Sequence, residues 1–233
     1  MSRPFPVDPE VLAAFRPMQA RDALAVARLH HAAMGESLWA RLGVRFLQQL
    51  YRALIDAEGF VAFVYEADPK VGVQGFIAGA TDPDRVMSDT FRRAWFLLGP
   101  AAFPRALQPG IFRRLVQTAR YSGASSVPGL PDGPVPESLF CSFVPELRGK
   151  RVAGHANKVL FDDLLSRGYR HVKITTDTSN TAAARQLGSW GFDALGQFTF
   201  YGKDMTAWLL DLQASPRVDA VGRHPMLERD VPG

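Results

Sequence analysis

The sequence lacks most of the features that would assign a protein to a class at once. It has a single cysteine, Cys141, among 233 residues, so the chain forms no internal disulfide and holds no cysteine-rich metal site. No apolar run approaches the roughly 20 residues that a membrane-spanning helix needs. The opening residues MSRPFPVDPEVLAAF have no apolar segment of signal-peptide length, because Asp8 and Glu10 interrupt them. We therefore expect a reduced, cytoplasmic protein without a transmembrane segment or a bound metal.

The sequence also has no large excess of positive or negative charge. The formal net charge is +4 and the isoelectric point is about 9.5. This balance suits an anionic ligand, but it is too mild for a nucleic-acid-binding protein, which needs a concentrated basic face. An ordinary surface would give the same values, so charge alone does not decide between these readings. The length and the 47% hydrophobic content indicate one sizeable domain with its own core.

The spacing of apolar residues predicts a chain of mixed helices and strands, of the α/β (α+β) class. Strands are expected over 11–18, 60–66, 71–80, 137–144, 171–176, 194–201 and 205–212. Helices are expected over 23–33, from 44 to about 58, over 153–167 and over 179–190. Asp22 is placed to cap the first of these helices.

Residues 82–136 interrupt this pattern. They contain two helical stretches, around 89–98 and 111–120, separated by GPAAFP and QPG, and they close with the Gly/Ser/Pro-rich SGASSVPGLPDGPVP. We interpret them as a helical insertion before the fourth strand, because they are too short to bury a core alone. Their interleaved aromatic and arginine residues fit packed amphipathic helices or a lid over a substrate. A membrane-surface helix is a third alternative, which the short, proline-broken stretches disfavour. Residues 214–233 are polar, and we expect a flexible tail there.

The stretch SFVPELRGKRVAGHANKVL (142–160) carries the first functional signal. An apolar strand stops at Pro145, a basic turn follows, and a helix begins. The first N–H groups of a helix have no internal partner, and the helix dipole favours negative charge there. Backbone N–H groups from Gly149 to Gly154 could therefore surround a pyrophosphate. The neutralising charges would come from Arg148, Lys150, Arg151 and Lys158. A solvated surface turn has the same composition, so the turn alone does not decide.

The order of these segments resembles the acyl-CoA-binding core of the GNAT family of N-acetyltransferases. The family turn reads Gln/Arg-x-x-Gly-x-Gly/Ala, and Arg148 and Ala153 fill its first and last positions. Further on, the family has Asn-x-x-Ala followed by Gly-Phe. The matching residues are Asn180, Ala183, Gly191 and Phe192. The resemblance covers most of residues 14–212 outside the insertion.

The resemblance implies a single acyl-CoA-binding domain over 1–213, with a mixed central sheet flanked by helices and a lid at 82–136. It implies acetyl-CoA, or another acyl-CoA, as co-substrate. The implied activity is an N-acyltransferase that moves the acyl group to a primary amine of a small or peptidic acceptor by direct attack. The implied coenzyme-binding residues are Phe143, Val144, Arg148, Gly149, Lys150, Arg151, Val152, Ala153, Gly154, Asn180 and Ala183. A homodimer is compatible with this reading, and no nucleic-acid partner is expected.

Two residues depart from the family pattern. Arg151 stands where the turn has glycine, and its side chain is tolerated if the residue begins the helix with φ of about −60°. Leu187 stands where many members have a tyrosine that protonates the departing thiolate. The second departure keeps an alternative open, namely a catalytically silent acyl-CoA sensor or interaction module with the same fold.

Acyl transfer would need a base, an oxyanion donor and an acid. A backbone N–H near Val144 is the expected oxyanion donor. The catalytic candidates are Glu137 and His31 as bases and Tyr201 as the acid. Each has a structural alternative: a solvated carboxylate, a histidine at a helix end, and a packed strand tyrosine. His30, Glu36 and Cys141 are further residues that could face the site.

Overall fold

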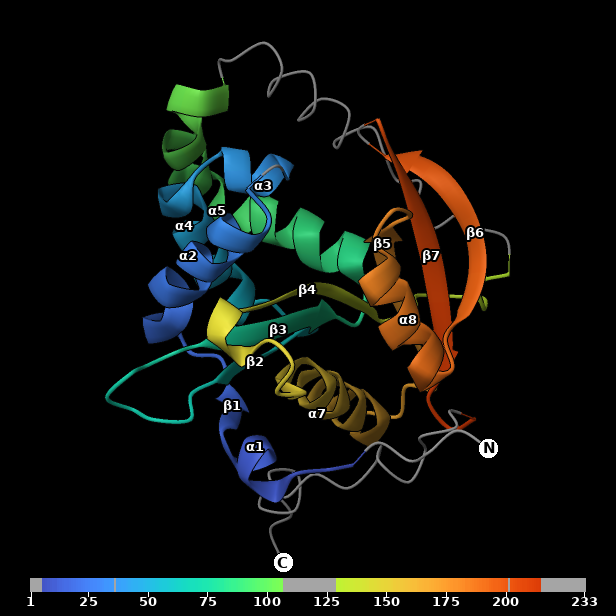
Figure 1. Ribbon diagram of the computed structural model, residues 1–233. Helices are drawn as coiled ribbons and strands as arrows, with labels where there is room; N and C mark the ends of the chain where they lie inside the picture. The colour runs from blue at the N-terminus through green and yellow to red at the C-terminus, as the bar shows by residue number, and fades with distance from the viewer. Residues whose placement is uncertain (1–5, 36, 107–128, 201, 215–233) are drawn as a thin grey trace, which may run out of the picture.

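The computed structural model describes residues 6–35, 37–106, 129–200 and 202–214. Its centre is a seven-stranded sheet with the order β1-β2-β3-β4-β5-β7-β6 (Figure 1). The strands are β1 (Phe15–Pro17), β2 (Phe60–Tyr65), β3 (Gly75–Ala80), β4 (Glu137–Phe143), β5 (His171–Asp177), β6 (Asp193–Phe200) and β7 (Lys203–Asp211). Only β4 and β5 run parallel; the other neighbouring strands are antiparallel. The predicted mixed sheet with flanking helices is therefore confirmed.

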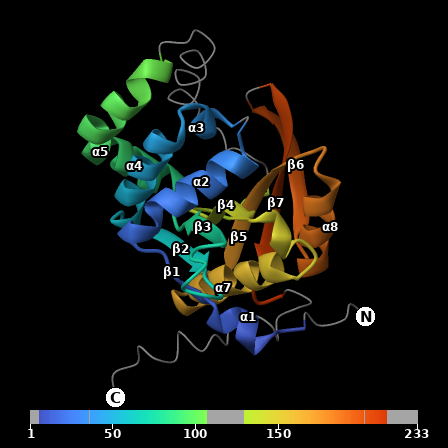
Figure 2. The ribbon, with the colours of Figure 1, turned by 60° about the vertical axis from the view of Figure 1, so that its left-hand side comes forward.

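Helices cover both faces of the sheet. They are α1 (Pro9–Ala13), α2 (Ala23–Ala33), α3 (Leu38–Arg41), α4 (Val44–Ile55), α5 (Pro83–Ala106), α7 (Val152–Ser166) and α8 (Thr181–Trp190). Helices α7 and α8 lie on one face, while α2, α4 and α5 lie on the other (Figures 1 and 2). Each layer has its own apolar cluster, centred on Leu160 and Phe161 of α7 and on Leu50 and Tyr51 of α4.

The sheet opens between β4 and β5. These strands have seven residues each, yet they pair only at Glu137 with Lys173 and at Ser138 with Ile174. On the other side of β4 the register with β3 shifts after Ala78, so that Leu139 is an extra residue. A bulge of this kind bends a strand and ends its pairing. Residues 139–143 of β4 therefore diverge from β5, and the backbone edge that would face β5 is not paired with that strand.

The start of the chain differs from its prediction. A strand was expected over 11–18, but residues 9–13 form α1 and only Phe15–Pro17 pair with β2. The carboxylate of Asp8 accepts hydrogen bonds from the N–H groups of Glu10 and Val11, and Pro9 occupies the first helical position. An aspartate cap followed by proline is a strong helix start, and here it outweighs the β-favouring residues.

Asp22 precedes α2 as predicted but does not cap it through its side chain. Both carboxylate oxygens bind the guanidinium of Arg16, at 2.7 and 2.9 Å, and one also accepts from the N–H of Gln19. Arg16 also donates to Glu66 at 2.8 Å. Asp22 therefore joins β1 to the turn before α2 instead of satisfying the helix end.

The insertion also differs in part from its prediction. A helix was expected to end near residue 98, whereas α5 continues through the GPAAFP segment to Ala106. Proline removes one helical hydrogen bond without forcing the helix to stop, and Ala101 and Ala102 favour its continuation. The second expected helix, 111–120, and the tail from 215 lie outside the described residues. Within the described ranges, none of the helices combines the length and apolarity that crossing a membrane would require.

Candidate functional site

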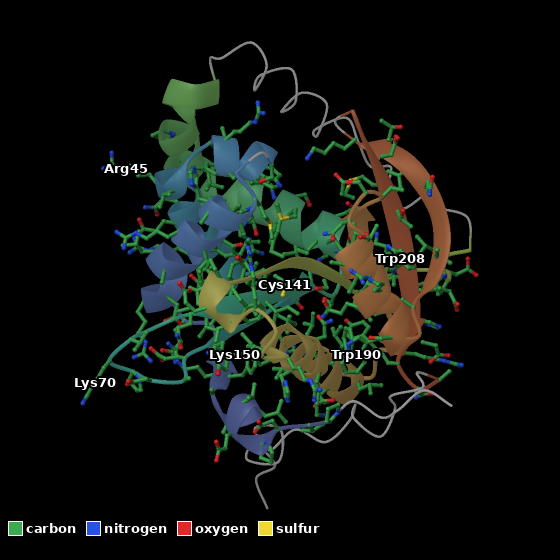
Figure 3. The ribbon with its side chains drawn as sticks, in the orientation of Figure 1. Arg45, Lys70, Cys141, Lys150, Trp190 and Trp208 are labelled. Atoms are coloured by element: carbon green, nitrogen blue, oxygen red, sulfur yellow. The ribbon has the colours of Figure 1, made fainter. Side chains whose placement is uncertain are left out.

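A cavity of about 360 Å³ lies where β4 ends and α7 begins. One wall is the end of β4 and the turn that follows it, and the opposite wall is the last part of α8. Its lining residues are Phe143, Val144, Leu147, Arg148, Gly149, Arg151, Val152, Ala153, Gly154, Gln186, Ser189 and Trp190. Figure 3 marks the turn into α7 by Lys150 and the end of α8 by Trp190. The cavity is therefore at the carboxyl end of the strand that departs from β5.

Four backbone N–H groups of this lining have no acceptor among the described residues. They belong to Gly149, Arg151, Val152 and Ala153. The N–H groups on either side are used, since Lys150 donates to the carbonyl of Leu147 and Gly154 donates to that of Arg151. Clustered free N–H groups at the start of a 15-residue helix form a site for an anion.

Arg151 is in a conformation that the sequence did not predict. Its φ is 62° and its ψ is 9°, in the left-handed region, and it is the only non-glycine with positive φ among the described residues. The condition under which its side chain would be tolerated without strain, a helix start with φ of about −60°, is therefore not met. The backbone keeps the left-handed conformation that suits glycine, although an arginine occupies the position at a cost of about 1–2 kcal/mol. Gly149, two residues earlier, has φ 77° and open space beside it.

Phe143 forms the wall on the strand side, and its place depends on Gly75. The two residues are directly paired across β3 and β4. A Cβ atom on residue 75 would overlap the ring of Phe143. The glycine therefore lets the aromatic ring approach the backbone of β3 at the cavity wall.

Of the eleven residues predicted to bind coenzyme, eight line the cavity and three do not. Lys150 is exposed on the turn, and Ala183 and Asn180 lie at the start of α8. The side chain of Asn180 caps α8, since its Oδ1 accepts from the N–H of Ala183 at 3.0 Å. The coenzyme roles of all eleven stay predictions. Lys158, expected to add charge to the turn, is instead buried and ion-paired with Asp162 at 2.6 Å.

Sequence reasoning missed Leu147 in the turn, the residues of α8 that complete the cavity, and one residue behind the turn. Gln186, Ser189 and Trp190 line the cavity wall. Gln186 and Trp190 follow Ala183 by three and seven residues, so helical spacing from Ala183 could have found them. The fifth missed residue, His155, is buried beneath the turn and hydrogen-bonds to the carbonyl of Arg151.

The described catalytic candidates, Glu137 and His31, are not part of the cavity lining. Glu137 begins β4, at the opposite end of the strand from Phe143. Its Oε2 is 3.1 Å from the Nζ of Lys173, and its Oε1 accepts from the hydroxyl of Thr175 at 3.0 Å. His31 is exposed near the end of α2. Tyr201 and Glu36 lie outside the described residues, so the roles of all four stay predictions.

Three further groups were considered for the acyl-transfer site. In the structure two of them pack in the core and the third makes a backbone hydrogen bond. His30 is fully buried and contacts the ring of Phe140. Cys141, at the middle of β4 (Figure 3), packs against the α7 cluster, and burial raises the pKa of its thiol to about 12. The N–H of Val144 donates to the carbonyl of Gln74 at 2.9 Å, so the expected oxyanion donor near Val144 would have to be another N–H of this strand end, and that role stays a prediction.

Leu187 lies on the inner side of α8. It is 4% exposed and belongs to the apolar cluster between α7, α8 and the sheet. Its neighbours on the helix, Gln186, Ser189 and Trp190, line the cavity instead. The position where the family pattern has an acid is therefore a core position in this chain.

Comparison with known proteins gives fold similarity at low sequence identity. No protein-family model matches the sequence, and no curated protein matches it. An acetyltransferase-like protein of Desulfovibrio desulfuricans, assigned to the GNAT family, superposes with a TM-score of 0.53 at 14% identity, over 85% of this chain and 98% of the other. An N-acetyltransferase of Staphylococcus aureus superposes with a TM-score of 0.53 at 17% identity, over 84% of this chain and 99% of the other. Arabidopsis thaliana NAA60, in complex with acetyl-CoA, superposes with a TM-score of 0.51 at 14% identity, over 86% of this chain and 98% of the other.

These similarities extend over almost the whole length of the solved structures and most of this chain. They agree with the resemblance read from the turn at 148–153 and from the order of the strands around it. The chain has the fold of the GNAT acetyltransferases.

Proposed function

We propose that the protein is an acyl-CoA-dependent N-acyltransferase, with acetyl-CoA as its simplest acyl donor and a primary amine as acceptor. The observation that carries the proposal is the cavity at the turn into α7, which is lined by four residues whose N–H groups have no acceptor among the described residues. The GNAT fold and the acetyl-CoA named with the Arabidopsis structure support the same donor. The predicted cytoplasmic location and the dimer stay predictions.

The pyrophosphate of the coenzyme would bind these N–H groups, with Arg148 and Arg151 adding positive charge. The pantetheine arm would run along the backbone edge of residues 139–143, which β5 does not pair. An extended arm with two amides can hydrogen-bond to such an edge as an added strand does. The thioester would then lie in the opening between β4 and β5.

In the transfer step the acceptor nitrogen attacks the thioester carbonyl carbon. A β4 N–H that faces the opening would stabilise the oxyanion, because preorganised donors of this kind contribute about 3–4 kcal/mol. The carbon–sulfur bond then breaks, the amide forms, and the nitrogen loses a proton. Glu137 is the proposed route for that proton, through water, since Lys173 and Thr175 already occupy its oxygens. Leu187 is buried in the core and cannot protonate the thiolate, so the proton would come from Tyr201, the predicted acid, or from solvent.

The second candidate is an acyl-CoA-binding sensor without transfer, and the buried Leu187 favours it. The test is a panel of small amines and peptides with acetyl-CoA, followed by thiol release and by the mass of each acceptor. Transfer predicts thiol release together with a mass gain of one acetyl group, both reduced in Glu137→Gln. Coenzyme binding without either signal across the panel would reject the transferase and leave the sensor.

A further inference from the structure

The imidazole of His155 connects two segments that are far apart in the sequence. His155 lies in the first turn of α7 and is 1% exposed. Its Nε2 lies 2.9 Å from the backbone nitrogen of Asp8, and its Nδ1 lies 2.9 Å from the carbonyl oxygen of Arg151. The backbone N–H of Asp8 can only donate, so Nε2 accepts and carries no hydrogen. The neutral ring therefore carries its hydrogen on Nδ1 and donates it to Arg151.

Burial keeps the ring neutral. It lowers the pKa of His155 below its ordinary value, despite the opposing effects of the Arg151 carbonyl and the Asp8 charge. The positive charges of Lys158 and Arg151 act in the same direction as burial. The Asp8 segment is itself fixed, since α1 packs against α7 and Leu12 is buried in the α7 cluster.

The hydrogen bond from Nδ1 acts on the least favourable backbone position of the turn. Arg151 is left-handed, which costs an L-residue other than glycine roughly 1–2 kcal/mol. Its carbonyl and the N–H of Val152 belong to one planar peptide unit. The oxygen also accepts from the N–H groups of Gly154 and His155, at 3.0 and 3.2 Å, and the ring adds a third and shorter contact. The ring therefore helps to fix the direction of the N–H of Val152, a residue of the cavity lining whose N–H has no acceptor among the described residues.

We infer that His155 is a positioning residue of the coenzyme site, which holds the Arg151–Val152 peptide so that its N–H faces the pyrophosphate, while the Asp8 N–H selects the donating tautomer. This inference rests on the proposed function. It concerns a contact made from behind the turn, by a residue that is not part of the cavity lining.

Two substitutions separate the two bonds of the ring. In His155→Asn the amide nitrogen takes the place of Nδ1 and keeps the donor to Arg151. In His155→Gln the amide reaches the place of Nε2, accepts from Asp8 and loses the donor to Arg151. Calorimetric titration of the full chain with CoA should give wild-type affinity for His155→Asn and a loss on the order of tenfold for His155→Gln. A weakening of about tenfold in His155→Asn, relative to the wild type, would overturn the inference even if His155→Gln failed to fold.

The Arg151→Gly background provides a control that distinguishes positioning of the turn from a general effect of His155 on folding. Glycine adopts the left-handed conformation without a tether. In the Arg151→Gly background, His155→Gln should therefore change CoA affinity less than twofold, roughly, against tenfold in the parent chain. An undiminished loss in that background would show that His155 acts on folding in general and would contradict the inference.

A readout without coenzyme separates this inference from the proposed function. If the wild-type protein does not bind CoA, the proposed function fails, but the backbone of Arg151 can still be examined. The ¹³Cα and ¹³Cβ chemical shifts of Arg151 in the free protein should indicate the left-handed conformation in the wild type and in His155→Asn, and lose that signature in His155→Gln. An unchanged signature in His155→Gln would overturn the inference whether or not CoA binds.

Discussion

The Nδ1 atom of His30 lies 2.7 Å from the hydroxyl oxygen of Tyr51, and its Nε2 has no hydrogen-bond partner among the described residues. The ring is fully buried, with the ring of Phe140 at 4.8 Å between centroids. Burial, together with a smaller effect of His31, lowers the pKa of His30 from 6.5 to about 4. The native core therefore holds His30 in its neutral form.

This pKa shift predicts how stability depends on pH. The unfolded chain binds a proton at His30 below about pH 6.5, whereas the folded chain binds one only near pH 4. The stabilising effect of neutral His30 is therefore complete above pH 6.5 and is lost as the pH falls toward 4. Across that window the free energy of unfolding should fall by up to about 3 kcal/mol on account of this residue. Urea unfolding at pH 7.5 and pH 4.5, roughly, measures the change, and His30→Asn should reduce it.

The left-handed Arg151 predicts a stabilising substitution. Arg151→Gly should raise the free energy of unfolding by about 1 kcal/mol, because glycine adopts positive φ without strain. Arg148→Gly is the matched control. It removes the same charge from the same turn, but at φ −60° and ψ 136°, where arginine is unstrained. It should lower stability by roughly 0.5–1 kcal/mol. Equal effects of the two substitutions in denaturant unfolding would argue against the strain.

Gly75 predicts a linked loss of stability and of coenzyme affinity. In Gly75→Ala the new methyl group overlaps the ring of Phe143, which must move into the cavity or push β4 away. Overpacking of this kind costs about 1–3 kcal/mol. Gly188→Ala in α8 provides the comparison, because nothing lies within 4 Å of its Cβ position. That change should stabilise the helix by about 1 kcal/mol. Thermal unfolding and a CoA titration of both variants test the difference.

The burial of Leu187 predicts that placing the family's tyrosine at this position would not restore an acid for the departing thiolate. Leu187→Tyr inserts a larger side chain with a hydroxyl into the α7 cluster, where Leu187 is 4% exposed. We expect a loss of about 1–3 kcal/mol in stability and no increase in kcat. Leu187→Met, of similar volume, should cost less than about 1.5 kcal/mol. A rise in kcat for the tyrosine variant would mean that α8 can turn this position toward the substrate.

Much of the fold could be predicted from apolar spacing. Helix α4 and strands β2, β5 and β7 lie close to their predicted ranges, because each has one clearly apolar face or a continuous apolar run. The bulge at Leu139 and the opening beyond it could not be predicted, since they depend on the pairing of β4 with strands on both sides. The start of α1 had a local signal in Asp8 and Pro9, but the β-favouring residues that follow hid it.

The sequence was enough to predict the basic turn of the candidate site, but not the long-range contacts that lie behind that turn. Charge, glycine and the helix start indicate an anion site over residues 148–154. The carbonyl of Arg151 is hydrogen-bonded to the ring of His155, and the tautomer of that ring follows from the N–H of Asp8, which is 147 residues away in the sequence. No local pattern contains such a long-range contact. Similarly, the burial of Leu187 is decided by which face of α8 meets the sheet.

The most direct test of the account is a calorimetric titration with CoA and acetyl-CoA of the wild type, Ala153→Glu and Ala153→Gln. The two substitutions are nearly equal in size at a residue that lines the cavity, but only glutamate puts negative charge beside the free N–H groups. We predict micromolar binding by the wild type and binding at least tenfold weaker, roughly, in Ala153→Glu than in Ala153→Gln. The absence of binding at millimolar coenzyme, or equal affinities of the two variants, would contradict an anion site at this turn.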